Sequence, residues 1–166
     1  MLPPRTYEVQ AGYALALLEM EAVVSWAADA LVAGFDSRSL RILAGLEPPL
    51  DQLEVGRLYS MAFTELGIRS LAEKEHIPFY IASVLRTMLS EKIERKKAMK
   101  RLADLHIDRG YDSQLRDFYL LYHAKSDLKS EEVQWYWQNA DRSNIDQVVD
   151  EYAKHWLANH PDENGA

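Results

Sequence analysis

The chain has 166 residues, no cysteine and a formal net charge of −7. This length is sufficient for one domain with a buried core, and the lack of cysteine excludes disulfides and thiolate metal sites within the chain. The acidic balance disfavours general binding to nucleic acid or anionic membranes and favours a basic partner. Because the sequence shows no signal-peptide pattern and no apolar run long enough to cross a membrane, we expect a cytoplasmic protein.

The first third of the chain has a helical pattern. Apolar residues recur every three or four positions from Thr6 to Ala33, which predicts one long helical region. Gly34 is expected to end this region, because glycine readily adopts the left-handed conformation that closes a helix. Asp36 or Ser37 can then cap a helix of about two turns over Arg38 to Ala44.

Two further caps are indicated in the middle of the chain. Asp51 lies three residues before a glutamate, a spacing typical of a capping box, and Gly67 is expected to end the helix that follows. Ser70 and Glu73 repeat the spacing and predict another start. Pro78 lies soon after, so this helix should either kink or begin again near the proline.

The next two predicted helices are also marked by polar residues and glycine. Ser90 is expected to cap a basic helix, with Gly110 just after its end. Asp112 or Ser113 is then expected to cap a helix with an aromatic apolar stripe.

The C-terminal part is predicted as a loop and two helices. Residues 123–132 are polar and are read as a loop, and a short helix is expected over residues 131–138. Ser143 should cap a final amphipathic helix, followed by a disordered tail over residues 161–166.

No segment alternates apolar and polar residues with a period of two, so no strand is predicted. About seven helices joined by short capped turns indicate an all-α fold without a sheet. We expect a single domain over residues 1–160, arranged as a helical bundle or a short stack of helical hairpins.

Five short motifs follow one another in residues 25–68: Trp26-Ala27, Gly34 with Asp36-Ser37, Leu43 to Leu46, Glu54-Val55 and Glu65 to Ile68. The run from Ser25 to Ile68 resembles a family of small, uncharacterised, all-helical bacterial proteins. The resemblance implies a bacterial source and a helical fold. It implies no activity, because none is established for the family.

One pair of residues has the spacing of a metal site. Glu73 and His76 show the Glu-x-x-His pattern that di-iron helical bundles use, but such sites need a second copy. Glu151 and His155 are four residues apart rather than three, and Glu73 is also explained as a cap. A helical metal-dependent enzyme using Glu73 and His76 is therefore an alternative, while our main expectation is no catalytic residue, no metal and no cofactor.

A basic segment stands out against the acidic background. Residues 91–101 carry six basic and two acidic side chains, so this segment has a charge of +4 and the rest of the chain −11. A solvated helix face is the usual meaning of such a segment. Binding of nucleic acid or phosphate is an alternative function, through the basic patch Lys92, Arg95, Lys96, Lys97, Lys100 and Arg101.

Three consecutive large rings mark residues 135–137. Successive helical residues point about 100 degrees apart, so three rings cannot all enter one core face and at least one should be exposed. The alternative is a segment buried on several sides. We expect a non-catalytic interaction protein of an immunity- or antitoxin-like kind that neutralises a basic partner. Binding to membranes or nucleic acid is not expected. The predicted partner site consists of Trp135, Tyr136, Trp137, Glu131, Glu132 and Asp141.

Overall fold

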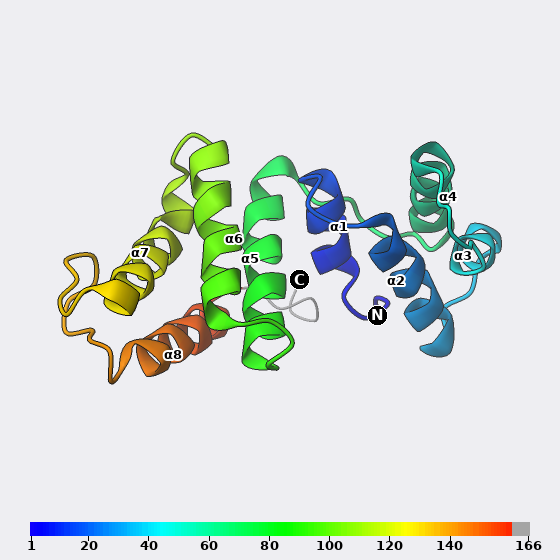
Figure 1. The fold of residues 1–166 in the computed structure, drawn as a ribbon. Helices are drawn as coiled ribbons and strands as arrows, with labels where there is room; N and C mark the ends of the chain where they lie inside the picture. The colour runs from blue at the N-terminus through cyan, green and yellow to red at the C-terminus, as the bar shows by residue number, and fades with distance from the viewer. Residues whose placement is uncertain (161–166) are drawn as a thin grey trace. The chain divides into compact units, whose positions relative to one another are not determined.

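The computed structural model describes residues 1–160, and over this range it is all-helical without strands (Figure 1). The predicted all-α class is confirmed, with eight α-helices in this range rather than about seven. None of them is long and apolar enough to cross a membrane. The predicted tail over residues 161–166 lies outside the described residues. The helices are α1 (Thr6–Ala14), α2 (Met20–Val32), α3 (Arg38–Ala44), α4 (Gln52–Glu65), α5 (Glu73–Leu89), α6 (Arg95–Asp108), α7 (Arg116–Ser130, preceded by a 3-10 turn over Ser113–Leu115) and α8 (Ile145–Ala158).

The chain divides into two compact units. The first comprises Met1–Tyr80 and the second begins at Ile81, so the boundary falls inside α5. Each unit has its own buried apolar residues. The single domain expected over residues 1–160 stays a prediction, and the units are described one by one.

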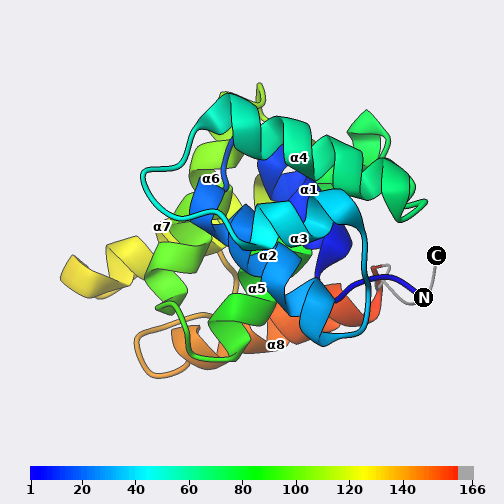
Figure 2. The ribbon, with the colours of Figure 1, turned by 90° about the vertical axis from the view of Figure 1, so that its right-hand side faces the viewer.

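In the first unit, α3 packs against both α2 and α4, and Figure 2 shows these three helices side by side. Aromatic rings fill the space between α2 and α4. The ring of Phe63 lies 4.4 Å from that of Tyr59 and 5.3 Å from that of Trp26, measured between centroids. Tilted and edge-on contacts of this kind add to the stabilisation from burying the rings.

Two predicted caps of this unit are confirmed. The Ser37 hydroxyl accepts a hydrogen bond from the amide of Leu40 at 3.2 Å, and the Asp51 carboxylate accepts one from the amide of Glu54 at 2.8 Å. Gly34 has a φ of +90°, as expected for a residue that closes a helix. These short polar side chains satisfy amides that have no partner inside the helix.

The single helical region predicted over Thr6 to Ala33 is wrong. Helix α1 ends because Ala16 adopts a left-handed φ of 57° and the amide of Leu17 donates back to the carbonyl of Gly12 at 2.9 Å. A side chain on Gly12 would meet the Cβ of Leu18 at 3.3 Å, so the glycine makes room for the chain to fold back. Left-handed residues at helix ends are usually glycine. Because this position holds Ala16, the sequence gave no sign that the helix ends here.

The predicted cap by Ser70 is also wrong. The Glu75 carboxylate takes this role, accepting a hydrogen bond from the amide of Ala72 at 2.7 Å and pairing with Arg69 at 2.8 Å. The arginine and the amide together lower the pKa of Glu75 to about 2. Helix α5 runs on through Pro78 and does not begin again there.

In the second unit, α7 packs against both α6 and α8 (Figure 1). Phe118 of α7 is completely buried, and the rings of Tyr152 and Trp156 lie edge-on to it at 5.4 and 6.0 Å. The Tyr152 hydroxyl donates to the Asp117 carboxylate at 2.7 Å. This aromatic contact joins α7 to α8.

The basic helix does not begin at Ser90. Helix α5 closes with Glu91 at a left-handed φ of 59° and with the amide of Lys92 donating to the carbonyl of Thr87 at 3.1 Å. Helix α6 therefore begins only at Arg95. The turn at Glu91, in a conformation that favours glycine, therefore separates Ser90 from the start of α6.

The loop predicted over residues 123–132 is wrong, because most of it belongs to α7. Ala124 and Leu128 are buried and continue the stripe of Leu121 at helical spacing, so this polar segment has a narrow apolar face. The helix predicted over residues 131–138 does not form, and the segment is a series of bends and turns.

The Ser143 cap of the last helix is wrong as well. Helix α8 begins two residues later, and the Ser143 side chain donates to Asp141 instead of accepting from the helix. The Asp141 carboxylate accepts the amides of Ser143 and Asn144 at 2.7 and 3.2 Å.

Replacing Tyr59 by Phe should leave the protein equally stable or stabilise it by about 1 kcal/mol. Among the described side chains, the Tyr59 hydroxyl is buried without a hydrogen-bond partner, and its burial raises its pKa. Tyr152→Phe is the control and should cost about 1 kcal/mol, because it removes the bond to Asp117. Urea unfolding measures both, and a clear loss of stability in Tyr59→Phe would show that the hydroxyl is satisfied.

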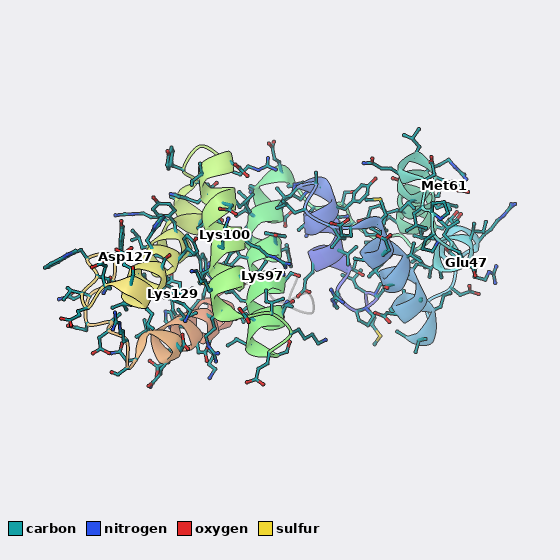
Figure 3. All side chains as sticks on the ribbon, in the orientation of Figure 1. Glu47, Met61, Lys97, Lys100, Asp127 and Lys129 are labelled. Atoms are coloured by element: carbon teal, nitrogen blue, oxygen red, sulfur yellow. The ribbon has the colours of Figure 1, made fainter. Side chains whose placement is uncertain are left out.

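Glu75 should make stability depend on pH. Its pKa falls from 4.5 to about 2 on folding, so its contribution is complete above about pH 4.5 and disappears as the pH falls through about 2. Glu75→Gln should therefore lower the Tm at pH 7, and the difference from wild type should shrink as the pH approaches 2. Glu47→Gln is the control, since that exposed carboxylate makes no ion pair in the described chain (Figure 3). A difference that does not change with pH would contradict this account.

Candidate protein-interaction site

The aromatic run lies in the segment between α7 and α8, residues 131–144, which we name the Trp135 loop. Its three rings differ in burial. The side chain of Trp135 is 91% exposed and that of Tyr136 is 41% exposed, whereas Trp137 is partly buried. Exposure of at least one ring agrees with the sequence prediction.

Trp137 attaches the loop to the core of the second unit. Its ring packs against a buried cluster of Ala124, Leu128 and Ile145. The ring of Tyr152 lies edge-on to it, with the centroids 5.2 Å apart. Trp137 therefore anchors the loop to the core. The sequence alone did not show which of the two tryptophans, Trp135 or Trp137, would be buried.

Gln134 fixes the backbone of the loop. Its side-chain oxygen accepts hydrogen bonds from the amides of Tyr136 and Trp137, both at 2.8 Å. Its side-chain nitrogen donates to the carbonyls of Trp137 and Ala140. One buried amide thus uses both acceptor sites and both donors on the loop itself.

Arg142 joins the loop to the end of α7. Its guanidinium donates to the carbonyl of Leu128 at 2.7 Å and to that of Glu131 at 2.8 Å. The carbonyls at the C-terminus of a helix have no partner within the helix and carry partial negative charge. Arg142 therefore satisfies this helix end and holds the start of the loop.

The three carboxylates of the predicted partner site differ in availability. Asp141 is occupied by the turn before α8, and the hydroxyl and amide of Ser143 lower its pKa. Glu131 and Glu132 are exposed and make no ion pair within residues 1–160. Only these two carboxylates are free to meet a partner.

The loop also forms a hollow of about 420 Å³, lined by residues 134–140. Behind it, the ring of Tyr136 lies 5.2 Å from that of His123, which in turn lies 4.4 Å from Tyr119. Val133, two residues before Trp135, is 56% exposed. Sequence reasoning missed Val133 and the support from His123, although the four-residue spacing of Tyr119 and His123 is a visible helical signal.

Two members of the predicted basic patch are neutralised by neighbours. Arg95 makes two hydrogen bonds to Asp150, at 2.7 and 2.8 Å. Lys100 pairs with Asp104 at 2.6 Å. Both pKa values are raised, chiefly by these bonds.

The other four basic residues have different surroundings. Lys92 precedes α6, and Lys97 and Arg101 are exposed on it; Figure 3 shows Lys97 and Lys100 projecting from this helix. Lys96 is half-buried and lines a pocket with residues from other elements. The patch is therefore not one continuous face.

Glu73 and His76 both lie on α5, in its first turns. Within residues 1–160 there is no group of three or more histidine, cysteine, aspartate or glutamate side chains that could hold a metal ion.

A scan against protein-family models, a search of the curated proteins and a search of the solved structures found no match to this chain. The resemblance over Ser25 to Ile68 therefore stays a prediction.

The two tryptophans should respond differently to truncation. Trp137→Ala should destabilise the protein by about 2 kcal/mol, because it removes a ring that packs against Leu128 and Ile145. Trp135→Ala should change stability by less than about 0.5 kcal/mol, since its ring is almost fully exposed. Urea unfolding of both variants measures this contrast, and equal losses would place Trp135 in the core.

Proposed function

We propose that this protein is a non-catalytic interaction module that binds a basic protein partner through the Trp135 loop. The observation that supports this most is the 91% exposure of Trp135 on a loop whose backbone is fixed by Gln134 and Arg142. A ring so exposed adds little to folding stability. Tryptophan is among the residues that contribute most to binding in protein interfaces.

A fixed loop favours binding. Ordering a flexible loop on association costs free energy, and a loop already held by Gln134 and Trp137 avoids most of this cost. The hollow beside Trp135 can receive one side chain of the partner. The proposed contact surface is Val133, Trp135 and Tyr136, together with the exposed Glu131 and Glu132 that directly precede them in the chain.

The chemistry of this surface favours a cationic partner. Glu131 and Glu132 attract lysine and arginine, and the face of an exposed indole binds such cations further. The net charge of −7 speeds encounter with a positively charged protein. Neutralisation of a basic toxin in the bacterial cytoplasm, by an immunity- or antitoxin-like mechanism, is the specific form of this function that the sequence suggests.

A photo-crosslinking experiment tests the proposal. Benzoylphenylalanine in place of Val133, in the full chain and in the cells that produce it, should give a defined adduct with a protein of positive net charge. Trp135→Ala should weaken binding of that purified partner at least about tenfold, because it removes the central ring. Leu53→Ala is the matched control, since Leu53 is 84% exposed but lies on α4, and it should bind like the wild type.

Replacing Glu131 and Glu132 by Gln should slow association and reduce its dependence on salt. The proposal fails if the adduct is unchanged in Trp135→Ala, if Leu53→Ala loses it equally, or if the captured protein is acidic.

A further inference from the structure

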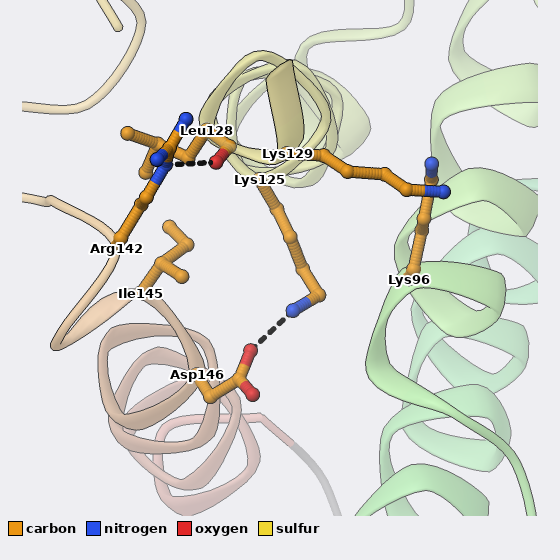
Figure 4. A pocket seen from close by; sticks show the side chains of 7 residues that line it. All are labelled: Lys96, Lys125, Leu128, Lys129, Arg142, Ile145 and Asp146. Atoms are coloured by element: carbon orange, nitrogen blue, oxygen red, sulfur yellow. Dashed lines mark hydrogen bonds and ion pairs between the residues drawn. The ribbon is translucent and has the colours of Figure 1, made fainter. Parts of the chain in front are cut away.

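The second unit contains a pocket of about 250 Å³ where α6, α7 and the start of α8 meet (Figure 4). Four of its seven lining residues are cationic, and they come from segments that are far apart in the sequence. We name it the lysine pocket. Its residues are Lys96, Lys125, Leu128, Lys129, Arg142, Ile145 and Asp146.

Two of the four cations already have partners. Lys125 pairs with Asp146, and Arg142 donates to backbone carbonyls at the end of α7. Lys96 and Lys129 make no ion pair within residues 1–160. Figure 4 shows Lys129 extending from α7 toward Lys96 on α6.

This arrangement has an excess of positive charge. Asp146 is the single carboxylate among the lining residues, and its charge is taken up by Lys125. Two ammonium groups that point toward one another repel, and an anion between them turns this repulsion into attraction. Lys96 and Lys129 are therefore positioned so that both can bind one anion.

The pocket also has an apolar part. Leu128 and Ile145 line it, each with a small exposed area, 4% and 6% of the residue. A bare inorganic ion makes no use of such a surface. A molecule with both a charged group and an organic body can contact the lysines and the apolar side chains together.

We propose that the lysine pocket binds a small phosphate-bearing organic molecule, with its phosphate between Lys96 and Lys129. Ammonium groups bind phosphate through charge-assisted hydrogen bonds, and the organic body would lie on Leu128 and Ile145. This inference does not rest on the function of the Trp135 loop. It goes beyond the basic patch expected from the sequence, since Lys125, Lys129 and Arg142 lie outside that patch.

Titrations followed by amide NMR test the proposal, with phenyl phosphate, inorganic phosphate and phenol as probes. Phenyl phosphate should shift the amides of Lys96, Leu128 and Lys129 and bind about tenfold more tightly than inorganic phosphate, which lacks the apolar part. Phenol should not bind. Lys96→Gln and Lys129→Gln should each weaken phenyl phosphate binding about tenfold, the effect of losing one charge-assisted bond.

Two more variants sharpen the test. Lys97→Gln is the matched control on the same helix, because Lys97 is exposed and does not line the pocket, and it should bind like the wild type. Asp146→Asn should strengthen binding, because it removes the carboxylate that holds Lys125.

Four outcomes would overturn the proposal. They are no shift at millimolar phenyl phosphate, an equal loss in Lys97→Gln, inorganic phosphate binding as tightly as phenyl phosphate, and a DNA duplex that shifts the amides of Lys96 and Lys129 and binds more tightly than phenyl phosphate. No shift would mean that the pocket binds no such molecule, and an equal loss in Lys97→Gln would mean that binding depends on general surface charge. Equal binding of inorganic phosphate would assign the pocket to phosphate alone, and the DNA result would assign it to nucleic acid.

Discussion

The hydrogen bonds of the Gln134 side-chain amide hold the Trp135 loop in the conformation that exposes Trp135. Its four hydrogen bonds close the backbone of residues 134–140 on itself, so this segment needs neither helix nor water to satisfy the groups involved. In this conformation Trp137 points toward the core and Trp135 toward solvent. The same sequence in a helix would distribute its rings differently, so the exposed surface depends on how Gln134, with Trp137 and Arg142, holds this loop.

Arg142 connects the two candidate sites of this unit. Its guanidinium satisfies the end of α7 and holds the start of the Trp135 loop, and it also lines the lysine pocket. The pocket thus contains an excess of cationic side chains, while the exposed carboxylates of Glu131 and Glu132 belong to the Trp135 loop. A chain with a net charge of −7 can therefore present surfaces of opposite character.

Much of the fold was predictable from local chemistry, and two of the failures share a cause. Caps by Ser37 and Asp51 and the stop at Gly34 are local signals, because the side chain or the glycine itself makes the helix end. The unpredicted break between α1 and α2 lies at Ala16, and the turn that delays the start of α6 lies at Glu91; both residues adopt left-handed backbone conformations without being glycine. Both residues are exposed, and non-glycine residues rarely take a positive φ, so their residue types gave no sign of these turns.

The candidate sites were predictable only in part. The expectation of an exposed ring assumed a helix, which does not form over residues 131–138. Which ring faces solvent depends instead on a loop held by Gln134, which the pattern did not single out. The lysine pocket joins side chains from positions 96 to 146, and no local spacing predicts their meeting. Backbone relaxation of the Trp135 loop tests the central claim most directly. We predict order parameters of about 0.85 over residues 134–140, as in the neighbouring helices, and values below about 0.6 would contradict a fixed loop.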